Sequence, residues 1–362
     1  MVLGARNPMG SNMTQLTQEF LHRFILFGNC EQRRKRGETD KAWHFDANSA
    51  DSVQNHVDGP LTRELIKERL FSFTIDEQPI FIFDRDTGTF KTVEGRKAMV
   101  TSDTKETVGV FKSGYKGHDF EMALLDKLDH LVGDGVGYST AGFTKANRAV
   151  AFVQLELPEN FDTKEGIKFR PNLGAATSFD GSLATIYKRG FTVWQCDNTV
   201  AAGLSEDGQS FKVKHSKYSG FKLDSARQAL DLIEVTAEQV TKEISKLAEW
   251  QVSDKQFADF LAKLSPVPEL KEGDNTRGRT LAISKAEAIR DLYETDDRAA
   301  PWRGTALGVL QATNTYNQHE APQRGGIDRD VRRFDNFFSG KTEANDKEVL
   351  DLLAKICERE YA

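Results

Sequence analysis

The segment Phe211–Lys222 contains the residue types that bind a single-stranded nucleic acid. Its sequence, FKVKHSKYSGFK, has four lysines, three aromatic residues and no acid. Lysine ammonium groups neutralise phosphates, and aromatic faces stack on bases at about 1–3 kcal/mol per base. We therefore expect a DNA-contacting set formed by Lys212, Lys214, Lys217, Tyr218 and Lys222.

The same segment has a second interpretation. In an extended strand Lys212 and Lys214 share one face, with Val213 on the other. Lysines on an edge strand also discourage aggregation, so this pattern is more often that of an amphipathic edge strand. Two arginines near the C-terminus, Arg332 and Arg333, are further candidates for contacting the nucleic acid.

A catalytic alternative rests on Asp180, Cys196 and His215, which form a nucleophile set if they converge. Asp180-Gly181 is also a typical turn, and a cysteine at the end of an apolar strand is usually a small core residue. We therefore assign no catalytic residue. The seven histidines lack the spacing of a zinc site, and we expect no metal or cofactor.

Composition narrows the class of protein. The chain has 362 residues, a net charge of −6 and 38% hydrophobic residues, which suits a globular protein without a general affinity for polyanions. Three separated cysteines favour a reducing compartment, and we expect a cytosolic protein. No run of about 18 apolar residues occurs, so we expect no membrane association.

The order of elements predicts an α+β fold: an antiparallel β-meander core with flanking helices and a mainly helical C-terminal third. Helices are expected at Thr14–Phe27, Leu61–Leu70, His118–Leu131, Asp254–Leu264, Leu281–Tyr293, Thr305–Tyr316, Asp328–Phe338 and Asn345–Arg359. The meander is expected within Phe71–Phe111, and further strands at Tyr138–Phe143, Ala149–Leu157, Gly174–Phe179, Leu183–Tyr187, Phe191–Cys196 and Phe211–His215.

Four regions are expected along the chain. They are a flexible leader with a short helix and a basic loop (1–60), an α+β core (61–265), a connector (266–279) and a helical C-terminal region (280–362). A heptad pattern of apolar residues from Ala226 to Leu247 predicts one long helix at the end of the core. That helix either packs within the chain or joins it to other copies.

Four segments together resemble a known family. They are Val100–Asp103 with Val108–Val110 and Gly114-Tyr115; Ser178–Ser182; Cys196–Thr199 with Val213–His215; and Arg303–Gly308 with Asn314–Tyr316 and Asn336. In their order they resemble the phage/plasmid-like protein family, domain of unknown function 932. A histidine typical of that family before Asp180-Gly181 is replaced by Phe179.

The resemblance implies a mobile-element protein of a bacterial cytoplasm, and it supplies no catalytic residue. With the basic segment, it leads us to expect a non-catalytic DNA-metabolism protein that binds single-stranded DNA, assists annealing or recombination, and forms a homo-oligomer. The alternatives are an oligomeric interaction protein, such as a host-takeover or anti-defence factor, and a hydrolase or nuclease.

Overall fold

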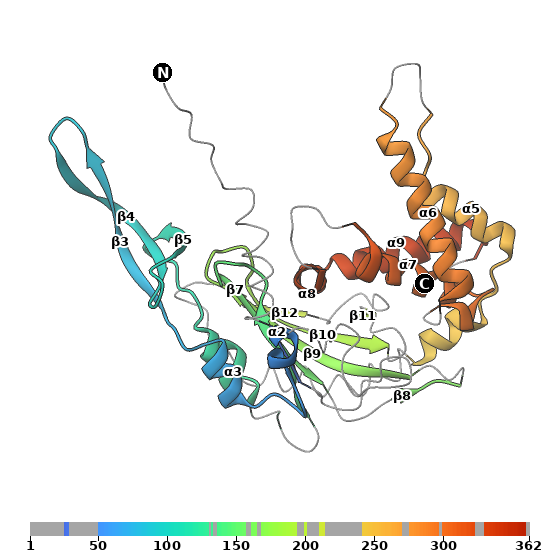
Figure 1. The fold of residues 1–362 in the computed structure, drawn as a ribbon, viewed down its shortest axis with the longest axis horizontal. Coiled ribbons are helices and arrows are strands. Elements are labelled where there is room, and N and C mark those ends of the chain that lie inside the picture. Colours follow the sequence, from blue (N-terminus) through green and yellow to red (C-terminus); the bar gives the residue numbers. More distant parts are fainter. Residues whose placement is uncertain are drawn as a thin grey trace.

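The computed structural model describes residues 25–28, 50–129, 132, 136–156, 161–164, 168–193, 199–200, 210–213, 241–269, 275–296, 299–322 and 329–359. A large sheet lies in the middle of the molecule, with a β-ribbon projecting from one side and a group of helices on the other (Figure 1). None of the helices among these residues is both long and apolar enough to cross a bilayer.

Nine of the described strands form the large sheet, in the order β11-β10-β9-β7-β6-β1-β2, with β12 beside β10 and β8 beside β9. They are β1 (Ile25–Gly28), β2 (His56–Val57), β6 (Gly137–Phe143), β7 (Val150–Glu156), β8 (Phe161–Asp162), β9 (Lys168–Ser178), β10 (Thr185–Val193), β11 (Thr199–Val200) and β12 (Ser210–Val213). Only β1 and β2 pair in parallel among them.

The central strands are buried on both faces. On one face, the hydroxyl of Tyr187 in β10 donates to the carbonyl of Ala123 in the π-helical segment η1 (Glu121–Asp126). On the other, Phe152 in β7 stacks on Phe334, with ring centroids 4.2 Å apart. Burial on both faces is reflected in the sequence of β7, where Val150–Val153 is an uninterrupted apolar run.

The projecting ribbon is a separate three-stranded sheet, made of β3 (Ile75–Asp84), β4 (Thr89–Thr101) and β5 (Thr107–Lys112). The short helix α3 (Arg63–Arg69) precedes it, and α2 (Ala50–Asn55) lies near β1. Strand β5 pairs only with the Arg96–Val100 part of β4. The distal part is therefore a two-stranded ribbon, and we call it the arm (Pro79–Glu94).

The C-terminal helices form a second hydrophobic core. They are α5 (Asp254–Leu264), α6 (Arg277–Thr295), η3 (Ala300–Trp302), α7 (Ala306–Thr315) with its π-helical extension η4 (Tyr316–Glu320), α8 (Arg329–Ser339) and α9 (Lys341–Ile356). Gly308 on α7 allows close packing, because a Cβ there would lie 2.3 Å from the Trp302 carbonyl oxygen. Helix α8 contributes its phenylalanines to the first core instead.

The predicted α+β class, the meander and the helical C-terminal part are confirmed. Three local predictions are wrong. Ile25–Gly28 is a strand and not the end of a helix, because Ile25 and Leu26 are fully buried between β2 and β6. The stretch 50–57, predicted as loop, contains α2 and β2. The two strands expected at Leu183–Tyr187 and Phe191–Cys196 are parts of one strand, β10.

The four predicted regions remain a prediction. Of the heptad helix, residues 226–240 lie outside the described residues, while 241–249 are helical. Ile244 and Leu247 are buried in the second core, beside Trp250. The described end of the helix therefore packs within the chain.

Candidate functional site: a polar pocket between the C-terminal helices

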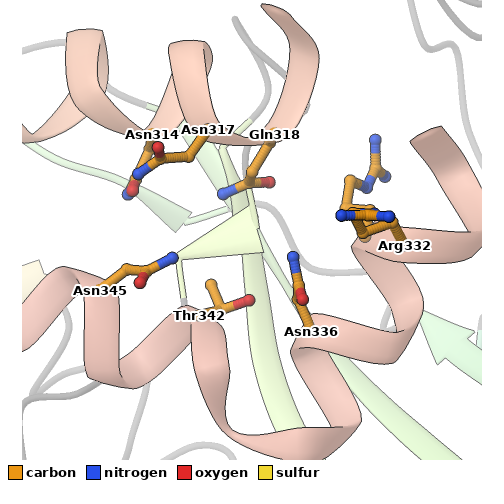
Figure 2. Close-up of a pocket in the computed structure, with 8 residues that line it drawn as sticks. Asn314, Asn317, Gln318, Arg332, Asn336, Thr342 and Asn345 are labelled. Atoms are coloured by element: carbon orange, nitrogen blue, oxygen red, sulfur yellow. The ribbon is translucent and has the colours of Figure 1, made fainter. Parts of the chain in front are cut away.

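A small polar pocket lies where three helical elements meet over the sheet (Figure 2). It is lined by Asn314, Asn317, Gln318, Arg332, Arg333, Asn336, Thr342 and Asn345. Its volume of about 20 Å³ has room for a water molecule or one small polar group. Gln318 and Asn336 point toward each other across it, and Asn345 points in from α9 (Figure 2).

Helix α7 and its extension η4 supply three amides to the pocket. The Thr305 hydroxyl caps α7 by accepting the Gly308 amide, and every residue of α7 is buried. Asn314 is 2% exposed, and its Nδ2 has no hydrogen-bond partner in the structure. A π-helical turn carries the chain on through Asn317 and Gln318; such turns often occur at functional sites.

Helix α8 supplies the arginines of the pocket. Its two sides carry different residues. Phe334, Phe337 and Phe338 pack on the sheet, while Arg332 and Asn336 occupy the opposite side of the helix. Two glycines make this docking possible. A Cβ on Gly174 or Gly190 would lie within 2.8 Å of the Phe337 ring.

A buried lysine fixes the start of α9 against the sheet. Lys188 of β10, 4% exposed, donates to the Phe337 carbonyl and forms an ion pair with Glu343. Helix α9 begins directly after Gly340, whose φ of 85° suits glycine at the end of α8. These contacts hold Thr342 and Asn345, in the first turns of α9, near the C-terminal end of α8.

The lining has cations and amides but no carboxylate, imidazole or thiol. Two guanidinium groups favour an anionic group, and five amides and a hydroxyl can donate hydrogen bonds to its oxygens. The lining offers no general base for a reaction. This pocket is therefore suited to holding an anionic group rather than to transforming it.

Three of the seven predicted site residues lie in the described part of the chain. Arg332 and Arg333 line the pocket, and the structure brings them together with amides that the sequence reasoning missed. Lys212 lies on β12, where it pairs with Ile186 of β10. Lys214, Lys217, Tyr218 and Lys222 lie outside the described residues.

The residues of the catalytic alternative are only partly described. Cys196 and His215 lie outside the described residues. Asp180 lies in a turn, where it accepts the Ser182 amide at 2.9 Å and pairs with Lys145. Burial opposes its ionisation, but the hydrogen bonds from Lys145 and Ser182 outweigh it and lower the pKa of Asp180.

These observations define an α+β protein whose C-terminal helices enclose a small, carboxylate-free pocket. The chain belongs to the family described as "Domain of unknown function (DUF932)", whose model matches residues 107–338. The match runs from β5 to α8, so it includes the two arginines of the pocket and excludes the arm. Comparisons with curated proteins and with solved structures find no match.

Proposed function

We propose that this protein is a non-catalytic DNA-metabolism protein that binds single-stranded DNA, and that the pocket holds one phosphate group of the strand. The observation that carries the proposal is the lining itself: two arginines and five amides around one small cavity, without a carboxylate. Arginine and side-chain amides are typical phosphate ligands in nucleic-acid complexes.

The position of β12 supports the same proposal. Strand β12 pairs with β10, and Ser210 of β12 lies opposite Lys188, the residue that holds α8 and α9. Among the described strands, β12 has β10 as its partner, so it forms an edge of the sheet. Lys212 therefore belongs to the part of the sheet on which the pocket helices dock.

The size of the pocket limits which part of the DNA strand it can hold. A cavity of about 20 Å³ holds a small group and not a whole nucleotide, so bases would lie outside it. Recognition through phosphate carries little sequence information. We therefore propose that the protein binds single-stranded DNA with little sequence preference. We further propose that it does so in a bacterial cytoplasm, where it assists annealing or recombination of a phage or plasmid genome.

The test is fluorescence anisotropy of the purified protein with labelled single- and double-stranded oligonucleotides across a salt series. We expect preferential binding of the single strand, with an affinity that falls steeply as salt rises. The variant Arg332→Gln/Arg333→Gln should lower the affinity at least about tenfold and reduce the salt slope by about 1.4, at roughly 0.7 per lost contact.

The matched control is Lys347→Gln, which removes a lysine whose side chain is 69% exposed on α9 and which does not line the pocket. It should leave the affinity within about twofold, because a distant exposed charge is largely screened. No binding at low salt, or equal losses in control and pocket variants, would contradict the proposal.

A further inference from the structure

The pocket has a buried end and a half-buried rim. Two of its lining residues, Asn314 and Thr342, are 2% and 7% exposed, whereas the other six are half-buried. Side chains from η4, α8 and α9 surround the cavity, and Gln318 and Asn336 face each other from opposite walls (Figure 2). A group that reaches Asn314 and Thr342 therefore enters past the rim and ends there.

This shape distinguishes between two kinds of phosphate in a DNA strand. A phosphate inside the strand is bonded to a sugar on each side, so two sugar links must leave the pocket with it. A terminal phosphate has a single sugar link, and its free oxygens point away from the strand. The cavity of about 20 Å³ holds one small polar group and not a sugar. It therefore suits the end of a strand better than the middle.

The hydrogen-bond donors of the lining favour the same kind of phosphate. Five amides, two guanidinium groups and the Thr342 hydroxyl can all donate. A terminal phosphate presents three strong acceptor oxygens, one more than a phosphodiester within a strand. Nδ2 of Asn314 has no hydrogen-bond partner in the structure and lies at the buried end, where it can donate to the additional oxygen.

The charge of the lining agrees with this choice. The lining has two arginines and no carboxylate. Two acids follow lining residues on α9 but are not part of the lining: Glu343 pairs with Lys188, and Asp346 is buried. A terminal phosphate carries about −1.5 to −2 charges near pH 7, whereas each phosphate within a strand carries one. Hydrogen bonds between ionised partners are the stronger ones, so the more highly charged group gains more from the two arginines.

We propose that the pocket binds the terminal phosphate of a single strand, with the phosphate at the buried end and the first sugar at the rim. This inference rests on the proposed function, because it specifies which phosphate of the strand the pocket holds. A phosphate monoester has the same chemistry at a 5′ end and at a 3′ end, so the experiment includes both.

The test is anisotropy of one short single-stranded oligonucleotide with an internal fluorophore. It is prepared with a 5′ phosphate, with a 3′ phosphate, or with hydroxyl groups at both ends. We expect one phosphorylated form to bind at least about tenfold more tightly than the hydroxyl form. A circular strand of the same sequence has no end and should bind like the hydroxyl form. Inorganic phosphate should displace the tightly bound form more effectively than sodium chloride at the same ionic strength.

Two variants connect this preference to the pocket. Arg332→Gln/Arg333→Gln should reduce the preference for the phosphorylated form to within about twofold. Asn336→Asp adds a carboxylate of nearly the same shape to the half-buried rim. It should weaken binding of the phosphorylated form at least about tenfold and of the hydroxyl form by no more than about threefold. Both variants should keep the circular dichroism and melting temperature of the wild type, and the control Lys347→Gln should keep the full preference.

Two outcomes would overturn the inference alone. Equal binding of all forms, weakened alike in Arg332→Gln/Arg333→Gln, would assign the pocket to a phosphate within the strand and leave the proposed function intact. A preference for the phosphorylated form that persists in both pocket variants would place the recognition of the end elsewhere on the protein. Failure of every form to bind at low salt would contradict the proposed function, and this inference with it.

Discussion

The arm and the pocket differ in the kind of side chain that they expose or bury. The arm carries phenylalanines that are more than half exposed, whereas the pocket carries amides and arginines between packed helices, including Asn314 at 2% exposure. In each region the side chains are the reverse of what the surroundings favour, since apolar groups stabilise a fold when buried and polar groups when solvated.

Both regions contain side chains that do not stabilise the fold in their present surroundings. Exposed apolar patches generally mark interaction surfaces, and a buried polar atom without a hydrogen bond, such as Nδ2 of Asn314, generally points to a bound water, ion or ligand. By contrast, the phenylalanines of α8 are buried against the sheet. The following predictions test the difference between these two regions.

The largest effect is expected at Lys188, which joins the sheet to the helices of the pocket. Lys188→Met leaves the Glu343 carboxylate, 20% exposed, without its cation. Removing one partner of a buried ion pair costs about 3–5 kcal/mol, and we expect about 3 kcal/mol by urea unfolding. The double variant Lys188→Met/Glu343→Leu should recover at least half of the lost free energy of unfolding. A cost below about 1 kcal/mol for Lys188→Met alone would show that the ion pair does not hold the helices.

The next effect concerns the docking of α8. Gly174→Ala places a methyl group 2.8 Å from the Phe337 ring and 2.9 Å from the Phe338 ring. Overpacking of this kind costs about 1–3 kcal/mol, and it should also weaken single-strand binding, because α8 carries the arginines. Gly88→Ala is the matched control, since its added methyl meets nothing within 4 Å although its φ of 66° adds strain. Equal DNA affinity in Gly174→Ala and wild type would argue against α8 as part of the site.

A smaller effect of opposite sign is expected at Asn314. Asn314→Leu replaces a buried amide whose Nδ2 has no partner with an apolar side chain of similar size. We expect the free energy of unfolding to rise by up to about 1 kcal/mol, while the affinity for single-stranded DNA falls several-fold. Thermal unfolding and anisotropy measure the two quantities. A variant that loses stability and keeps its affinity would indicate that Asn314 supports the fold and not a ligand.

The smallest effect is a pH dependence at the turn between β4 and β5, where Asp103 lies. Arg148 donates two hydrogen bonds to Asp103, at 2.8 and 2.9 Å, and this contact lowers the pKa of Asp103 to about 2. Because the folded-state pKa is depressed below the usual 3.8, the contribution is present above about pH 4 and is lost as the pH falls toward 2. The Asp103 side chain is 44% exposed, so we expect less than about 1 kcal/mol.

Asp103→Asn removes the titrating group. Urea unfolding between pH 2 and 6 should show a shallower loss of stability for this variant than for the wild type. Identical profiles would exclude Asp103 as a contributor to acid sensitivity.

The sequence predicted helices better than strand boundaries, for physical reasons. Helix α5 was predicted at its exact limits, because Ser253 and Gln256 form a local capping box. The strand Ile25–Gly28 was predicted as the end of a helix, since its pairing with β6 depends on residues more than a hundred positions away.

The candidate site was predicted in part. Arg332 and Arg333 were identified as a charge cluster, but their amide neighbours come from helices that only tertiary packing brings together. One local signal was present: Asn314, Asn317 and Gln318 recur at spacings of three and four, a polar stripe on an otherwise apolar helix. The face of the arm that carries Phe81, Phe83 and Phe90 required the register of β3 and β4, which the Asp84–Gly88 turn alone does not fix.

The central claim is that the two regions have separate tasks. Its most direct test is one anisotropy experiment on a short single-stranded oligonucleotide with the wild type, Arg332→Gln/Arg333→Gln and Phe83→Thr/Phe90→Thr. We predict that the arginine variant loses at least about tenfold in affinity and that the arm variant stays within about twofold. Equal affinities in all three proteins, or a loss confined to the arm variant, would contradict the account.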